Sequence, residues 1–400
     1  MSGTHSPILT GLKVVEFAHI IAGPLAGTLL ADLGATVVHV EPPGSGDPGR
    51  SMGEAKDGVS LWWKVSARNK RSVCLDLRQP EGRAVAVQLA AWADVVISNI
   101  KADTLEKWGL DWPSLRRVNE KLVYLQISGF GAKSSLRAAP GFGKVGEARS
   151  GAVFLTGFAD GPPVHSGFSH GDSVTALMGG FGIMAALYRQ AKDPHFEGEW
   201  IDLALFESLF RLIEWQIIQY DQFGVSTTRN GNHMGVRPAA VVNTYLSRDS
   251  EWITVTSATP KSVQNIARLL GLDDSKYVTR EQQREAADEL DDLLGKWIAL
   301  RDADECLKVM AELEVVASKI FSAEDIINDP TYNELKDIVT VSDPELGDVR
   351  MQGVIPRMDT YPGGIWRTGP ALGEDGELVY KEWLGMADDE FTKLRGAGVI

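Results

Sequence analysis

The first 130 residues alternate short apolar runs with segments of helical pattern, and this alternation limits the possible folds more than any other feature. Strands are expected at the apolar runs 13–17, 36–41, 72–77, 94–98 and 121–131. Helical patterns at 23–34 and 80–93 lie between some of them. Strands of near-continuous apolar content joined by helices are typical of a parallel sheet that is covered on both faces. We therefore predict an α/β, Rossmann-like domain that binds its ligands at the carboxyl ends of the strands.

A change of pattern near residue 200 indicates a second unit, since one hydrophobic core rarely serves 400 residues. Residues 199–224 carry apolar side chains at helical spacing, which predicts one long helix. We expect residues 1–200 to form the first part of the large domain and residues 201–235 to form a linker helix and loop. A small α+β domain is expected at 236–325, and a return to the large domain at 326–400.

Composition and charge argue against several classes of function. Asp and Glu outnumber Lys and Arg by 54 to 40, and the net charge of −14 opposes a nucleic-acid or anionic-membrane surface. Cys74 and Cys306 have no metal-ligand spacing and fit a reducing cytoplasm. The N-terminus lacks the pattern of a signal peptide. The apolar run at 174–188 is too short to span a bilayer. We therefore expect a cytoplasmic protein without a metal site, a nucleic-acid partner or a membrane partner.

The first turn between strand and helix does not favour dinucleotide binding. Residues 17–24 hold a single glycine, whereas a pyrophosphate-binding turn needs several closely spaced ones. The basic run at 67–72, with Arg78 after it, fits either a solvated loop or a site for the phosphates of a nucleotide-like ligand. For His19, in the first turn, an ordinary loop or packing role is favoured over catalysis.

One carboxylate, Asp172, stands between Gly171 and Ser173, just before a long apolar helical pattern. Position 172 is a natural N-cap, because an Asp side chain accepts hydrogen bonds from free backbone N–H groups at a helix start. The positive helix end also favours the ionised carboxylate, and nearby glycines leave room for a bulky ligand. Residue chemistry alone therefore leaves two interpretations open: a helix cap, which it favours, and a nucleophile of covalent catalysis.

Segments along nearly the whole chain resemble the family III CoA-transferases. The similar segments include residues 11–47, the Asn-Lys-Arg-Ser run at 69–72, the segment 161–172 that ends in Gly-Asp, and residues 370–379. The resemblance implies a Rossmann-like large domain with an inserted small α+β domain, and two subunits interlocked as a homodimer. It also implies transfer of CoA from an acyl-CoA donor to a carboxylic acid, with coenzyme A as a substrate and no prosthetic group.

For Asp172, the resemblance implies a catalytic role. The carboxylate would attack the acyl-CoA thioester to give a mixed anhydride, and the released CoA thiolate would attack the aspartyl carbonyl to give an aspartyl-CoA thioester. The acceptor acid would then repeat both steps in reverse order. The residues implied to contact CoA are Ile20, Ile21, Ala22, Leu75, Arg78, Asn99, Ile100, Lys107 and Phe142.

Departures from the family pattern narrow the expected reaction. The oxalate-using members have Gln and Tyr-Glu where this chain has Ile21 and Phe142-Gly143, so oxalate and formate are disfavoured. The racemases have a histidine where this chain has Phe142, which removes one of the two bases that exchange of an α-proton needs. Two alternatives remain beside CoA transfer: an acyl-CoA racemase or epimerase on the same fold, and a non-catalytic acyl-CoA-binding protein.

The sequence does not identify the two acids. Trp62, Trp63 and Phe142 suggest apolar walls, and Arg149 and Arg237 are candidates to receive a second carboxylate. For each of them a structural role is favoured. The segment Glu374-Asp375-Gly376 departs from the usual family sequence, and the sequence alone gives no reason for it.

Overall fold

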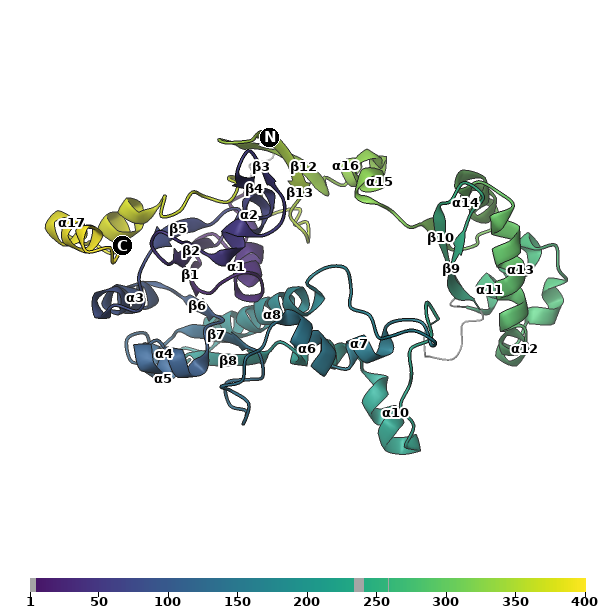
Figure 1. Cartoon of the computed structure of the whole chain (residues 1–400), viewed down its shortest axis with the longest axis horizontal. Coiled ribbons are helices and arrows are strands. Elements are labelled where there is room, and N and C mark those ends of the chain that lie inside the picture. The colour runs from purple at the N-terminus through teal and green to yellow at the C-terminus, as the bar shows by residue number, and fades with distance from the viewer. Residues whose placement is uncertain (1–4, 234–240, 258) are drawn as a thin grey trace. The chain divides into compact units, whose positions relative to one another are not determined.

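The computed structural model describes residues 5–233, 241–257 and 259–400 (Figure 1). The chain divides into two compact units. Unit 1 comprises Met1–Ala152, Ser166–Glu214 and Pro330–Ile400, and unit 2 comprises Val153–His165 and Trp215–Asp329. These limits differ from the expected ones, because residues 201–214 belong to unit 1 instead of to a linker.

Unit 1 is built on a six-stranded sheet in which every neighbouring pair of strands is parallel. The strands are β1 (Lys13–Phe17), β2 (Thr36–Glu41), β5 (Arg71–Cys74), β6 (Val95–Ser98), β7 (Val123–Ser128) and β8 (Glu199–Ala204). Their order across the sheet is β5-β2-β1-β6-β7-β8 (Figure 1). The order reverses between β1 and β6, and such sheets bind their ligands beyond the carboxyl ends of the strands at this point. The predicted Rossmann-like α/β fold is confirmed.

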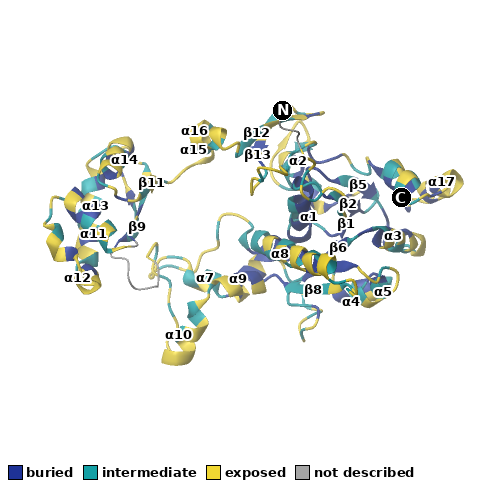
Figure 2. Cartoon of the chain, turned by 180° about the vertical axis from the view of Figure 1, so that it is seen from behind, coloured by how far each residue is buried: buried dark blue, intermediate teal, exposed yellow. Residues whose placement is uncertain are grey.

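Helices cover both faces of this sheet. One face packs against α1 (Ala22–Asp32) and α8 (His170–Lys192). The other face packs against α3 (Pro80–Trp92), α4 (Ala102–Trp108), α5 (Trp112–Arg116) and α17 (Asp388–Gly396). The central strands are therefore buried on both sides (Figure 2), which explains their near-continuous apolar sequence.

Shorter elements complete unit 1. They are η1 (Pro48–Ser51), β3 (Ala55–Lys56), β4 (Val59–Ser60), α2 (Leu61–Ser66), α6 (Gly143–Arg149), α9 (Glu207–Leu212), α16 (Pro330–Glu334), the hairpin of β12 (Ile338–Asp343) and β13 (Gly347–Gln352), and the π-helix η3 (Leu378–Trp383). Helix α7 (Ala152–Leu155) lies where the chain passes from unit 1 to unit 2.

The predicted long helix at 199–224 is wrong. Its first part is strand β8, which pairs with β7 along its whole length, and two separate helices, α9 and α10 (Trp215–Phe223), follow. A short apolar run fits a buried strand as well as one turn of a helix, so its spacing alone cannot separate the two. The strand is selected by the free edge of β7, which the local sequence does not reveal.

Unit 2 combines a three-stranded antiparallel sheet with several helices. The strands are β9 (Val242–Leu246), β10 (Trp252–Thr256) and β11 (Ala317–Lys319). The helices after α10 are α11 (Pro260–Leu269), η2 (Asp274–Tyr277), α12 (Arg280–Glu285), α13 (Ala287–Ala299), α14 (Ala303–Glu312) and α15 (Ala323–Asn328). Unit 2 has its own apolar core, to which Ile253, Ile266 and Leu294 belong. Within the described residues, no helix combines the length and the apolar character needed to cross a bilayer.

Candidate active site

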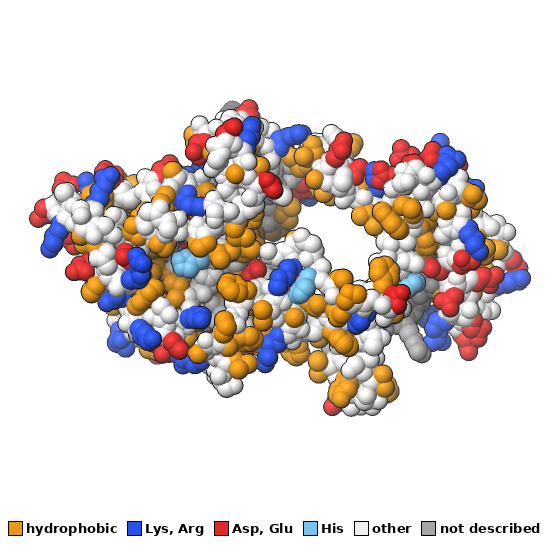
Figure 3. Space-filling model, in the orientation of Figure 1, with side chains coloured by type: hydrophobic (Ala, Val, Ile, Leu, Met, Phe, Trp, Pro, Cys, Tyr) orange, Lys and Arg blue, Asp and Glu red, His pale blue; other side chains and the backbone are white. Residues whose placement is uncertain are grey.

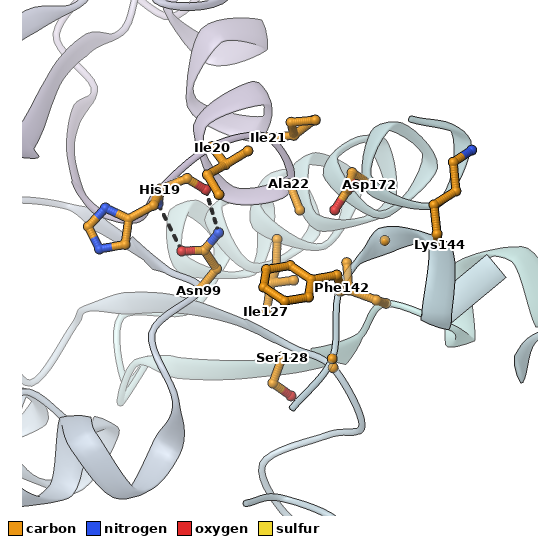
Figure 4. Close-up of a pocket in the computed structure, with 14 residues that line it drawn as sticks. His19, Ile20, Ile21, Ala22, Asn99, Ile127, Ser128, Phe142, Lys144 and Asp172 are labelled. Carbon is orange, nitrogen blue, oxygen red and sulfur yellow. Dashed lines mark hydrogen bonds between the residues drawn. The ribbon is translucent and has the colours of Figure 1, made fainter. Parts of the chain in front are cut away.

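The turn after β1 lies at the point where the strand order reverses. Asn99 follows β6 directly, and its side-chain amide forms two hydrogen bonds with the backbone of His19. The amide oxygen accepts from the His19 N–H at 2.9 Å, and the amide nitrogen donates to the His19 carbonyl at 2.7 Å (Figure 4). Ile20 follows with a φ of 68°, and α1 then begins at Ala22. The ends of two neighbouring strands thus form one hydrogen-bonded unit at the predicted ligand position.

A cavity of about 380 Å³ opens beside this turn. Its walls are the turn 19–22, Asn99, the end of β7, the start of α6 and Asp172. Figure 4 shows Asp172 and Phe142 on the same side of the site as Ala22, with the Phe142 ring near Ile127. The first turns of α1, α6 and α8 therefore all reach this cavity.

Asp172 is not the cap of its helix. The cap residue of α8 is Ser169, and Asp172 is the third residue of the first turn. The carboxylate of Glu147, on α6, accepts from the Gly171 N–H at 3.0 Å and so satisfies a free donor of α8. Within the described residues, the Asp172 carboxyl forms no hydrogen bond that would occupy it. The capping prediction is wrong because a second carboxylate takes that role.

The surroundings of Asp172 disfavour its charge. Burial, and after it the negative charge of Glu147, raise the pKa of Asp172 to about 6, while Lys144 acts in the opposite direction. Burial and Glu147 therefore oppose the ionised form that the helix end was expected to favour. At pH 7 the group is still mostly ionised, and it is more basic than an ordinary carboxylate.

Gly143 permits the position of the Asp172 carboxyl. A Cβ at residue 143 would lie 2.0 Å from Asp172 Oδ2, so no larger residue fits there while the carboxyl keeps its place. The Lys144 ammonium points away from the cavity (Figure 4). It donates to both Glu147 oxygens at 3.0 and 3.2 Å and to the Ser166 and Phe168 carbonyls at 3.0 Å. Lys144 thus ties the segment before α8 to α6.

A second cavity of about 250 Å³ shares His19 with the first. It is lined by Leu75, Arg78, Ile100 and Trp108 among others, and Arg78 is exposed and paired with Asp76 at 2.8 Å.

The two cavities contain all but one of the residues that the sequence assigns to CoA. Ile20, Ile21, Ala22, Asn99 and Phe142 line the first cavity, and Leu75, Arg78 and Ile100 line the second. Lys107 is exposed in the last turn of α4 and lines neither, whereas its neighbour Trp108 lines the second.

His19 lines the site, although the sequence favoured an ordinary loop or packing role for it. It is the one residue that the two cavities share, and within the described residues its buried Nδ1 has no hydrogen-bond partner. Burial lowers the pKa of His19, so the ring is neutral at pH 7. The signal available in the sequence was its place directly after the first strand of a parallel sheet, where ligands bind.

Two cations of the basic run at 67–72 form buried ion pairs. Arg68 pairs with Asp32 at 2.5 Å, and Lys70 pairs with Glu16 at 2.9 Å; all four side chains are buried. The charges of Arg68 and Lys70 are therefore used inside the protein, and neither side chain lies in a solvated loop. Arg71 is partly exposed and pairs with Asp375 at 2.8 Å. Arg78 lines the second cavity, and its contact with a phosphate stays a prediction.

The structure gives a contact for Asp375, in the C-terminal segment, and for Arg149, one of the two arginine candidates. Asp375 accepts hydrogen bonds from Arg71 at 2.8 Å and from the Ser72 N–H at 3.0 Å, which joins the C-terminal segment to the edge strand β5. Arg149 stacks over the rings of Phe130 and Phe206, 5.3 and 5.4 Å from their centres. Arg237 lies outside the described residues.

Trp62, Trp63 and Phe142 were the suggested apolar walls. Trp63 is buried and donates through Nε1 to the Pro370 carbonyl at 2.9 Å, so it belongs to the packed interior. Trp62 lines a neighbouring cavity of about 360 Å³. Only Phe142 lines the cavity that holds Asp172.

Comparison with known proteins places this geometry in a family. The sequence profile of CoA-transferase family III matches residues 9–376. The chain is 37% identical over 398 residues to a succinyl-CoA–D-citramalate CoA-transferase of Chloroflexus aurantiacus, with 98% of each chain covered. It is 32% identical to the beta subunit of a succinyl-CoA–L-malate CoA-transferase of the same organism, with both chains covered in full.

A solved structure has the same fold. The crystal structure of a CaiB/BaiF family protein from Brucella suis superposes with a TM-score of 0.82 at 29% sequence identity, and covers 94% of this chain and 100% of that one. The predicted family resemblance is confirmed. The chain belongs to CoA-transferase family III, a family of enzymes that act on CoA thioesters.

Proposed function

We propose that this protein transfers coenzyme A from an acyl-CoA donor to a carboxylic acid through covalent intermediates on Asp172. The environment of the Asp172 carboxyl is the observation that supports this proposal most directly. This carboxyl faces a cavity at the strand-order reversal, its pKa is raised to about 6, and within the described residues no donor occupies it. A carboxylate that is ionised at pH 7 yet more basic than usual suits nucleophilic attack.

The proposed reaction has four balanced steps. An Asp172 oxygen attacks the thioester carbonyl, the C–S bond breaks, and a mixed anhydride and CoA thiolate result. The thiolate then attacks the aspartyl carbonyl and releases the donor acid, which leaves an aspartyl-CoA thioester. The acceptor carboxylate attacks this thioester to form a second anhydride, and the thiolate finally attacks the acceptor acyl carbon. Asp172 is regenerated as a carboxylate, and no prosthetic group takes part.

The two cavities suggest how the thioester lies. We place its reacting end in the cavity of Asp172 and its nucleotide end in the cavity of Leu75, Arg78 and Ile100, with the turn at His19 between them. Residues of the first turns of α1 and α6 line the first cavity. Helix N-termini favour negative charge, so these turns are positioned to stabilise the oxyanions of the acyl-transfer steps.

The donor is proposed to be the CoA thioester of a short dicarboxylic acid. Two relatives that match nearly all of this chain are named for succinyl-CoA and a hydroxy dicarboxylic acid. Ile21 and Gly143 take the places of the polar residues of the oxalate-using members, which supports an acid other than oxalate.

A homodimer and a cytoplasmic location are also part of the proposal. Helix α8 carries a stripe of exposed apolar side chains, Leu177, Phe181, Met184 and Tyr188, between 40% and 74% exposed. Much of α8 is coloured as exposed in Figure 2. Hydrophobic side chains also gather on α10, at the bottom of Figure 3. Exposed apolar surface of this extent supports burial against another subunit. The free thiols of Cys74 and Cys306 fit a reducing compartment.

The test is a transfer assay with succinyl-CoA, acetyl-CoA and medium-chain acyl-CoA donors against a panel of mono- and dicarboxylic acids. New acyl-CoA products that form with the wild type and are absent with Asp172→Asn support the proposal. Deuterium uptake at the α-carbon of the donor without any acceptor acid identifies a racemase instead. CoA binding without turnover of any pair identifies a non-catalytic binding protein.

A further inference from the structure

The turn that shapes the proposed acyl-CoA site contains a strained residue. Ile20 has a φ of 68°, in the left-handed region that β-branched side chains rarely adopt. Such a conformation costs about 1–3 kcal/mol and persists only where the surroundings enforce it. Ile20 and Ile21 line both the Asp172 cavity and the neighbouring cavity that Trp62 lines.

The Asp47 carboxylate forms hydrogen bonds with the backbone N–H of Ile20. Both carboxylate oxygens of Asp47 accept from the Ile20 N–H, at 3.0 and 3.1 Å, and Oδ1 also accepts from the Gly49 N–H at 2.7 Å. The Asp47 side chain is buried, with 1% exposed. Its own backbone N–H donates to Glu41 Oε2 at 2.9 Å, and Glu41 is paired with Arg50 at 2.6 Å. The carboxylate is therefore fixed before it meets Ile20.

A row of buried charges stands behind Asp47. His39 contacts Asp47 Oδ2 through Nε2 at 3.1 Å and Glu16 Oε2 through Nδ1 at 2.7 Å. Lys70 donates to Glu16 at 2.9 Å and to the Pro24 carbonyl, in the first turn of α1, at 2.6 Å. The row thus begins at the Ile20 N–H and ends at the helix that follows Ile20.

The charges of this row balance one another. Burial alone would lower the pKa of His39, but its hydrogen bonds to Asp47 and Glu16 outweigh burial and raise the pKa to about 9. For Asp47, burial alone would raise the pKa, but His39 and the backbone donors lower it to about 2. Both groups are charged at pH 7, and a charged acceptor forms stronger hydrogen bonds with N–H groups than a neutral one.

We propose that Asp47 is a positioning residue for the acyl-CoA substrate: its carboxylate holds Ile20 in the left-handed conformation that places Ile21 and Ala22 beside Asp172. The proposal rests on the function proposed above, since it concerns the same cavity. Without the carboxylate, Ile20 relaxes toward an ordinary backbone conformation. The start of α1 then turns away from its place in the cavity wall. A misplacement of about 1 Å at a reacting site costs up to about 10²-fold in rate.

The test is a double-mutant cycle between Asp47 and Ile20 in the full-length protein. Glycine adopts a positive φ without strain, so Ile20→Gly removes the need for the clamp. We expect Asp47→Ala to lower kcat/KM for succinyl-CoA, and to raise the Kd of CoA measured by calorimetry, at least tenfold. In the Ile20→Gly background the same substitution is expected to change both values less than threefold.

Two further variants separate positioning from general stability. Asp343 is another buried carboxylate of unit 1, paired with Lys64 at 2.9 Å. Asp343→Ala is expected to have the same effect in both backgrounds, because its contacts do not reach Ile20. Asp47→Asn keeps one carbonyl acceptor for the Ile20 N–H, so it is expected to lose less than Asp47→Ala. If Asp47→Ala does not fold, the cycle is measured with Asp47→Asn.

Equal losses from the Asp47 substitution in both backgrounds overturn the proposal, and so does an Asp47 variant with wild-type kcat/KM and CoA affinity. The calorimetric Kd keeps this result separate from the proposed function. If the wild type binds CoA but turns over no donor and acceptor pair, CoA transfer is wrong, while the Kd cycle still decides the role of Asp47.

Discussion

Two aspartates, Asp47 and Asp172, lie beside the same turn, and their surroundings shift the pKa of the carboxyl group in opposite directions. The carboxylate of Asp47 is almost fully buried, yet three hydrogen bonds and the charged His39 lower its pKa to about 2. Asp172 is less buried, yet its pKa is raised to about 6. Depth alone therefore does not decide the state of a carboxylate. The number of donors aimed at it decides whether burial is offset.

The difference separates a structural role from a chemical one. The Asp47 carboxylate forms hydrogen bonds with the Ile20 N–H, the Gly49 N–H and His39, all of them within the protein. Within the described residues, no hydrogen bond occupies the Asp172 oxygens, as the proposed attack on a substrate requires, and Glu147 accepts from the Gly171 N–H at the start of α8. A reactive carboxylate held this way costs stability, as reactive groups commonly do.

The largest effect is expected from Asp172→Asn. The amide cannot form the anhydride, so we expect kcat for CoA transfer to fall at least about 10³-fold. CoA affinity is expected to stay within threefold, because the side chain keeps its size. Product formation by mass spectrometry and calorimetric titration measure the two. A variant with one tenth of the wild-type rate would contradict the nucleophilic role.

The same variant tests the stability cost. The folded pKa of Asp172 lies above its unfolded value, so the folded state binds the extra proton between about pH 4 and 6, and stability from this group is lost as pH rises through that window. Asp172→Asn is therefore expected to gain about 1–3 kcal/mol over the wild type at pH 8 and nothing at pH 4. Equal denaturation midpoints at both pH values would disprove this.

Removal of one charge from the buried row behind Asp47 should lower the free energy of unfolding. Lys70→Met leaves the buried Glu16 with His39 alone, and we expect a loss of about 3–5 kcal/mol in the free energy of unfolding. The control is Arg189→Ala, which removes an exposed pair with Asp193 and should cost about 0–1 kcal/mol. Chemical denaturation at pH 7.5 compares them. Equal losses in the free energy of unfolding would show that the buried Lys70 pair stabilises the fold no more than an exposed pair does.

Gly143→Ala tests the space around the reactive carboxyl. The added Cβ overlaps Asp172 Oδ2 at 2.0 Å and must displace it, so we expect a loss of about 10²-fold in kcat/KM with little change in stability. Gly396→Ala in α17 is the matched control, because a Cβ there meets no other atom within 4 Å. A normal rate in Gly143→Ala would mean that the carboxyl does not react from this position.

The smallest effects are expected on the pH profile. The transfer rate should fall about tenfold per pH unit below pH 6, as Asp172 becomes protonated. Glu147→Gln removes a negative charge beside Asp172 and should move the midpoint down, whereas Lys144→Gln removes a positive charge and should move it up. The opposite directions are diagnostic. Shifts of the same sign would contradict the assignment of these neighbours.

The sequence predicted those features that depend on local pattern. The parallel sheet follows from strands and helices that are each encoded within a few residues, and the first turn was found because it follows β1. The buried row was not predicted, because it joins residues far apart in the chain, such as Glu16 and Lys70. The left-handed Ile20 was not predictable either, since isoleucine avoids this conformation and only Asp47 explains it.

The site was predicted only in part for a related reason. Asp172 was found through the family resemblance, but its assignment as a cap failed because the competing carboxylate, Glu147, lies on another helix, 24 residues before the Gly171 N–H that it accepts from. Strand β8 was missed because its partner β7 lies far from it in sequence. These features depend on contacts between segments that lie far apart in the chain, and such contacts cannot be predicted from the local pattern of a single sequence.

The most direct test of the central claim is to trap the covalent intermediate. The protein is incubated with succinyl-CoA, treated with hydroxylamine or borohydride, digested and analysed by mass spectrometry. The account predicts a modified Asp172 in the wild type and no modification of residue 172 in Asp172→Asn. An unmodified Asp172 in a sample that forms new acyl-CoA product under the same conditions would contradict it.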